Sequence, residues 1–210
     1  MPSLGGGSRG PATVMTSILK PETLFFWAFD HPELMARFRD ILAKKMVAFN
    51  QVLRKFSGNT KMGWSITDDN SALFNPELYR EYCYPVLENV FCTLASEQAR
   101  RHQHSDSAMG HLLDQQYELG IRSVNYGPEI DVAFIRKKMP EAIIHGHMPP
   151  FLLRNGSPDE IRQRLVEDFE KAGETGGLNI TTAGSLSAGT GVGRMRYFMQ
   201  IVQTDCRYSD

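Results

Sequence analysis

The chain has 210 residues, of which 41% are hydrophobic and 22% charged, proportions typical of a folded protein with one sizeable core. Its formal net charge of -1, with Lys and Arg scattered along the sequence, argues against nucleic acid as a partner. The longest apolar stretch, residues 24–29, is far too short to span a bilayer, and the first residues lack the pattern of a targeting signal. We therefore expect a cytoplasmic protein with no membrane partner.

The three cysteines indicate neither a disulfide framework nor a thiolate zinc site. Cys83, Cys92 and Cys206 are odd in number, and none belongs to a Cys-x-x-Cys pair. We expect reduced thiols.

The first part of the chain predicts one short strand and two helices. Residues 5–11 predict a loop, the apolar run 12–15 predicts a strand, and Pro21 marks a helix start. A second helix is expected from residues 30–33 to Gly58, because apolar residues recur there three or four positions apart: Leu34, Phe38, Ile41, Leu42, Met46, Phe49 and Leu53.

From there a strand followed by a helix recurs along the sequence. We expect strands at residues 62–66, 102–106, 121–126, 142–147 and 178–182. The helices are expected at residues 75–90, 107–119, 129–138, 157–172 and about 195–202, and residues 157–160 form a strong capping sequence for the fourth.

This alternation predicts an α/β protein with a parallel sheet, either an open doubly wound sheet or a barrel, in a single domain over residues 1–210. In both architectures the chemistry gathers at the carboxyl ends of the strands. The polar or small residues at those ends are Asp68, Asp69, His104, Asp106, Tyr126, His147, Gly184 and Ser185.

Metal-capable side chains occupy every second position of two expected strands. His102, His104 and Asp106 alternate in one strand, and His145 and His147 alternate in another. Alternation places each set on one side of its strand. His147, which is nearer the carboxyl end, is the preferred ligand of its pair.

Several of these features also have a structural interpretation. Asp68 and Asp69 could cap the turn before the next helix, since aspartates favour such turns. The glycine-rich residues 189–193 before a helix suggest a phosphate-binding loop, but the spacing of their glycines favours a flexible strand-to-helix connection. The aromatic cluster at residues 25–29 fits a core or an interface.

Short segments across nearly the whole chain carry a family resemblance. They are residues 10–14, 30–34, 67–69, 75–82 with Pro85, 104–106, 145–149, 156–161 and 184–193. In this order they resemble the uroporphyrinogen decarboxylase superfamily, which also contains corrinoid-dependent methyltransferases. The resemblance implies a (β/α)8 TIM barrel, of which this chain supplies about six β/α units and lacks the first two.

A partial barrel exposes two strand edges and part of its interior. One explanation is a fragment or a divergent short form. The other is a partner that closes the barrel, either a second copy in a homo-oligomer or a completing chain.

Several residues differ from the family pattern, and these differences limit the reactions and metals that we expect. Where true decarboxylases carry a site tyrosine and a site histidine, this chain has Ser17 and about Gly184. The methyltransferase branch binds zinc through a His-x-Cys motif and a later cysteine. The motif corresponds here to residues 104–106, with Asp106 in place of the first cysteine. Residues 184–185 lie where the second cysteine would be. Loss of both thiolates favours a harder divalent metal or a weakly held zinc.

The expected site follows from these positions. His104, Asp106 and His147 would hold the metal, helped by His102 or Glu129. Asp68, Asp69 or Asp106 would serve as catalytic base, and Tyr126 and Ser185 would bind substrate. The resemblance then implies a methyltransferase that acts on a small methylated compound or methyl acceptor, with a corrinoid protein as methyl partner. The alternatives are uroporphyrinogen decarboxylation and a non-catalytic binding or assembly subunit.

Overall fold

Six parallel strands form one sheet in the order β1-β2-β3-β4-β5-β6, so each strand lies beside its neighbours in sequence. The computed structural model describes residues 6–58, 63–95, 97–98, 101–173 and 176–207. The strands are β1 (Gly7–Arg9), β2 (Trp64–Thr67), β3 (Arg101–Ser105), β4 (Ser123–Tyr126), β5 (Ile143–Met148) and β6 (Leu178–Thr182). The predicted α/β fold with about six parallel strands is confirmed.

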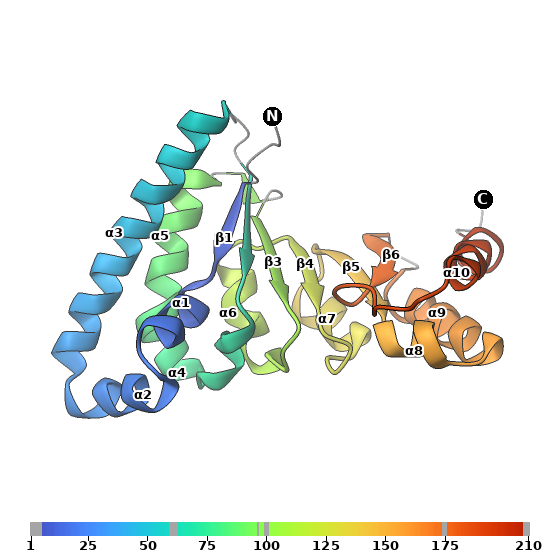
Figure 1. The fold of residues 1–210 in the computed structure, drawn as a ribbon, viewed down its shortest axis with the longest axis horizontal. Helices are drawn as coiled ribbons and strands as arrows, with labels where there is room; N and C mark the ends of the chain where they lie inside the picture. Colours follow the sequence, from blue (N-terminus) through green and yellow to red (C-terminus); the bar gives the residue numbers. More distant parts are fainter. Residues whose placement is uncertain (1–5, 59–62, 96, 99–100, 174–175, 208–210) are drawn as a thin grey trace.

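Helices connect successive strands and line one side of the sheet. They are α1 (Pro11–Ile18), α2 (Pro21–Asp30), α3 (Pro32–Ser57), α4 (Pro76–Leu78), α5 (Tyr84–Leu94), α6 (Leu113–Glu118), α7 (Val132–Lys138), α8 (Pro150–Asn155), α9 (Pro158–Ala172) and α10 (Val192–Thr204), with 3-10 turns η1 (Asp69–Leu73) and η4 (Gly110–Leu112) and a π-helical turn η2 (Tyr79–Cys83). Figure 1 shows α3 and α5 side by side at one end of the molecule and α10 at the other.

The first strand lies earlier than the sequence predicted. Gly7–Arg9 pairs with β2, whereas the apolar run 12–15 lies inside α1, so that prediction is wrong. The reason is a contact distant in sequence. The carboxylate of Asp68 accepts hydrogen bonds from the backbone amides of Ala12 (3.3 Å) and Thr13 (2.7 Å), amides that a helix start leaves without partners.

Two later helices differ from their predicted extents. The helix expected at 107–119 is reduced to η4 and α6. The helix expected at 75–90 is interrupted by the π turn η2, directly before α5, where Pro85 provides no backbone donor.

Helix α9 and strand β6 are the elements that local sequence predicts best. Ser157 accepts from the backbone of Glu160, whose carboxylate accepts from the backbone of Ser157, so the predicted capping box is present. Helix α9 ends at Ala172 and β6 spans Leu178–Thr182, both as expected.

The two faces of the sheet differ in polarity. The helix-covered face is buried and mostly apolar, with Ile66, Val124, Tyr126 and Ile144 in the main core, although β3 contributes the buried Gln103 and Ser105. The opposite side, which we call the inner face, carries polar side chains of intermediate exposure: Ser65, Thr67, His102, His104, Ser123, Asn125 and His145. Because side chains alternate along a strand, each strand contributes side chains both to the core and to the inner face.

None of the helices that the structure describes combines the length and apolar character needed to cross a membrane.

Candidate metal centre

Three acid and imidazole groups converge at the carboxyl ends of β2 and β3. Asp69, His104 and Asp106 each offer a ligand atom, and these atoms all lie within 4.8 Å of one another. His104 Nε2 lies 3.7 Å from Asp106 Oδ1, and the Asp106 amide donates to Asp69 Oδ1 at 2.8 Å. The parallel pairing of β2 with β3 brings these strand ends together.

The orientation of His104 is fixed by Asn125 on the neighbouring strand β4. The Asn125 amide nitrogen donates to the carbonyl oxygens of His145 and Thr182, which can only accept. Its Oδ1 therefore accepts, both from the backbone amide of Gly184 at 3.2 Å and from His104 Nδ1 at 2.8 Å. In the neutral imidazole, the proton resides on Nδ1 and the lone pair on Nε2.

This tautomer points a lone pair at a carboxylate. His104 Nε2 and Asp106 Oδ1 are both electron-rich, and their separation of 3.7 Å exceeds a hydrogen bond. A cation between them would bind both. An imidazole whose far nitrogen is held by a side-chain oxygen is the usual arrangement of a metal-ligating histidine.

A second hydrogen-bonded row lies on the inner face. His102 Nδ1 and Ser123 Oγ are 2.8 Å apart, Ser123 Oγ and His145 Nε2 are 3.0 Å apart, and His145 Nδ1 lies 2.9 Å from the amide of Asn179. Burial, with the His145 and His104 imidazoles nearby, lowers the pKa of His102 to about 4. Burial also lowers the pKa of His145. The imidazoles of His102 and His145 are thus neutral at neutral pH.

His147, predicted as the third ligand, is not brought to this group. Its side chain is buried, and the charged groups around it are Arg164, Asp131 and Glu129, on the helix-covered side. Burial and then Arg164 lower the pKa of His147 to about 4. Alternation does not continue to His147 because Gly146 has a φ of 154°, outside the range of a regular strand. Asp69 is the third member of the group instead.

The predicted helpers also differ in position. His102 and Glu129 lie outside the convergent group. Glu129 is exposed and lines a charged hollow together with Arg164 and Lys171.

Tyr126, predicted to bind substrate, belongs to the core. It is fully buried on the helix-covered face, its hydroxyl donates to Gln116 Oε1 at 2.6 Å, and burial raises its pKa. A substrate on the inner face would not reach it. Its neighbour Asn125 faces that side instead.

Asp68 caps a helix, as the structural interpretation of this residue predicted, but the helix is not the one expected. It caps α1 through Ala12 and Thr13 rather than the turn that follows it. Burial raises its pKa to about 6, partly offset by these hydrogen bonds. The carboxylate is enclosed and does not face the inner side.

The loop after β6 reaches the rim of the site. A Cβ on Gly184 would lie 2.5 Å from Asp106 Oδ1, and Gly184 has a φ of 85°, so this position favours glycine. Ser185 follows it and is exposed. Ser17 lies in α1, where its hydroxyl donates to the carbonyl of Thr13.

The sequence contained signals for residues that the predictions missed. In β4 the apolar Val124 and Tyr126 alternate with Ser123 and Asn125, so alternation alone assigns the polar pair to the inner face. Arg9, expected in a loop, ends β1 beside Asp69.

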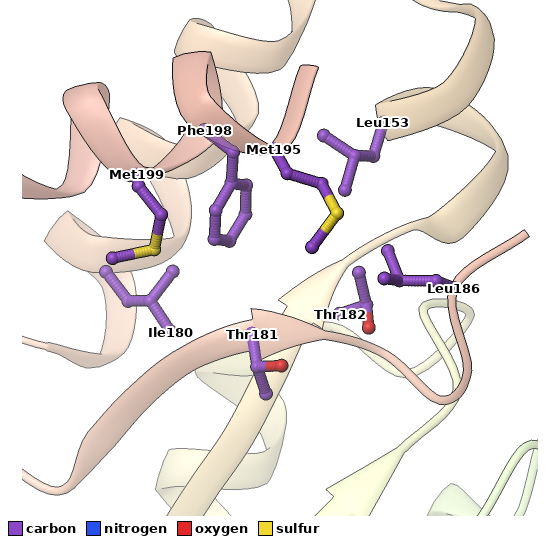
Figure 2. A pocket seen from close by; sticks show the side chains of 8 residues that line it. All are labelled: Leu153, Ile180, Thr181, Thr182, Leu186, Met195, Phe198 and Met199. Carbon is purple, nitrogen blue, oxygen red and sulfur yellow. The ribbon is translucent and has the colours of Figure 1, made fainter. Parts of the chain in front are cut away.

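A separate apolar hollow of about 220 Å3 lies between β6 and α10 (Figure 2). Its lining residues are Leu153, Ile180, Thr181, Thr182, Leu186, Met195, Phe198 and Met199. It contains no acidic or imidazole side chain, so the candidate chemistry lies in the metal group rather than here.

Comparison with known proteins assigns the chain to a family. A family model described as "Uroporphyrinogen decarboxylase (URO-D)" matches residues 2–204. The chain belongs to the uroporphyrinogen decarboxylase family. A search of curated proteins found no match.

Among solved structures, the URO-D chain is similar to a methyltransferase from Methanosarcina mazei. The similarity covers 94% of this chain with a TM-score of 0.74 and 16% sequence identity. At this identity the likeness concerns the fold. The chain spans 57% of the length of that protein, and its six parallel strands correspond to part of a barrel.

Proposed function

We propose that this URO-D family chain carries the metal-binding half of a methyltransferase site. The proposed reaction transfers a methyl group between a small methylated compound and a corrinoid protein. The observation that carries the proposal is the convergence of Asp69, His104 and Asp106, with the lone pair of His104 Nε2 directed at a carboxylate.

The donor set fits a divalent ion. Two carboxylates and one imidazole favour zinc or a harder ion such as manganese or iron over soft metals. When bound, such an ion would act as a Lewis acid on an oxygen, nitrogen or sulfur atom of the substrate.

The residues around the group have separate roles in this proposal. Asp69 and Asp106 supply negative charge, while Asn125 holds His104 in the ligating tautomer. Ser185, at the start of the loop that touches Asp106 through Gly184, would contact the substrate. The neutral imidazole of His102 borders the same inner face.

Porphyrinogen decarboxylation is the second candidate, because the matching family model is described by that activity. By the family resemblance, the positions of its site tyrosine and histidine correspond to Ser17 and about Gly184. The Ser17 hydroxyl is bonded within its own helix.

A methyl-transfer assay separates the two. Zinc- or manganese-loaded protein would be incubated with cob(I)alamin and a panel of methylated amines, thioethers and aryl methyl ethers. Transfer of the methyl group to cobalt, with release of the demethylated substrate, is followed by the visible spectrum of methylcobalamin. We expect turnover with at least one compound, its loss in His104→Ala, and its retention in His31→Ala, which changes an exposed residue at the start of α3.

The same preparation would be incubated with uroporphyrinogen. Formation of coproporphyrinogen above background, without methyl transfer to any compound in the panel, would contradict the proposal and favour the decarboxylase.

A further inference from the structure

Arg9 has unused hydrogen-bonding capacity beside the candidate metal centre. It is the last residue of β1, and its only charged contact among the described residues is Nη1 to Asp69 Oδ2 at 3.9 Å. That distance is too long for a hydrogen bond, and no hydrogen bond from Arg9 to a described residue is present. A guanidinium offers five N–H donors in a planar fork suited to a carboxylate.

Strand register places Arg9 at the height of the metal group. Arg9 pairs with Thr67, and Thr67 pairs with His104. Neighbouring strands are about 4.8 Å apart, so the backbones of Arg9 and His104 are separated by roughly 10 Å. The guanidinium reaches toward the metal group, with Nη1 3.9 Å from Asp69 Oδ2, so a ligand as small as one carboxylate can contact both.

The surface beside Arg9 is hollow and polar. An open hollow of about 370 Å3 is lined by Gly7, Ser8, Arg9, Ser65 and Thr67. The side chains of Ser65 and Thr67 belong to the inner face, and Thr67 pairs with His104 of the candidate centre.

The charges make anion binding depend on the metal. Asp69 and Asp106 together with Arg9 leave one net negative charge, which repels an anion. A divalent ion reverses this to one net positive charge. Asp69 Oδ1 accepts from the Asp106 amide, and Oδ2 is the oxygen nearest to Arg9.

We propose that Arg9 is an anion-recognition residue, and that the site takes a small ligand bearing one carboxylate only when the divalent ion is bound. One end of the ligand lies at the metal group and the carboxylate is held by the Arg9 fork. This inference rests on the proposed metal centre and adds the chemical class of its ligand.

The test measures Mn²⁺ binding to the full chain by calorimetry, without additive, with acetate, and with acetamide as the uncharged isostere, at constant ionic strength. Binding of anion and metal must strengthen each other reciprocally. We expect acetate, but not acetamide, to tighten Mn²⁺ binding to the wild type. Arg9→Met should reduce this enhancement about tenfold or more, and Arg9→Lys should restore part of it. Arg39→Met, which removes an arginine paired with Asp40 on α3, should keep the full enhancement.

Circular-dichroism melting checks that the variants fold. Equal acetate enhancement in wild type and Arg9→Met would overturn the role of Arg9, because acetate would then bind the metal alone. Absence of Mn²⁺ binding in the titration without additive would overturn the metal centre itself, and the Arg9 inference with it. The two failures are therefore read from different titrations.

Discussion

Asp68 combines complete burial with a carboxylate charge, and its role is to hold α1 against the end of β2. Its oxygens accept from two amides at the first turn of α1. Replacement by Ala would leave these buried donors without partners. We expect Asp68→Ala to lower the free energy of unfolding by roughly 2 kcal/mol or more, measured by urea denaturation.

The same residue predicts a pH dependence. The pKa of Asp68 is raised to about 6 in the folded protein from 3.8, so between these values the folded state binds more protons than the unfolded state. The contribution of Asp68 to stability therefore rises as the pH falls from about 7 to 4. The stability gap between wild type and Asp68→Ala, measured by urea denaturation at both pH values, should be larger at pH 5 than at pH 7.5. A gap that narrows on acidification would contradict the raised pKa.

Single residues also show where sequence reasoning succeeds. Alternation correctly placed His102 and His104 on one face, because β3 is a regular strand. It misplaced His147, because Gly146 leaves the regular strand conformation. Asp69 was predicted as a catalytic base, but its approach to His104 depends on strand pairing, which a single strand's pattern does not contain.

At the scale of elements, α9 offers a direct test of local capping. Ser157→Ala removes one side of the capping box and should cost about 1 kcal/mol, or a fall of roughly 2–4 °C in melting temperature. Glu160→Gln should cost less, because glutamine also completes the box. An unchanged melting temperature for Ser157→Ala would mean that other contacts set the start of α9.

Elements with their start and stop signals in their own sequence were predictable, and those decided by distant contacts were not. Helix α9 has its cap at Ser157 and its end at Gly173 within one segment. Helix α1 depends on Asp68, 56 positions from Ala12, so its apolar run alone looked like a strand. Strand β1 has only three residues, and its pairing with β2 rather than its composition defines it.

At the scale of the molecule, the sheet has two edges that no described strand covers, at β1 and at β6. Helix α3 also carries an exposed apolar stripe: Leu34, Ile41, Phe49, Val52 and Phe56, with exposures of 42%, 47%, 64%, 50% and 81%. Exposed edges and large apolar patches favour association. We propose that a second chain covers these surfaces.

Light scattering at micromolar concentration tests this. We expect the chain to self-associate, and the double variant Phe49→Lys with Phe56→Lys to shift the equilibrium toward the monomer. A soluble wild-type monomer with cooperative melting would contradict the proposal.

We propose that Asp69, His104 and Asp106 bind a divalent metal. The most direct test of this proposal is the metal content of purified protein after loading with zinc, manganese or iron(II) and exhaustive dialysis. We expect one ion per chain in the wild type and in His147→Gln, and loss of the ion in Asp69→Ala and His104→Ala, with folding verified by melting. A wild type that retains no ion, or an Asp69→Ala variant that binds as tightly as the wild type, would contradict the account.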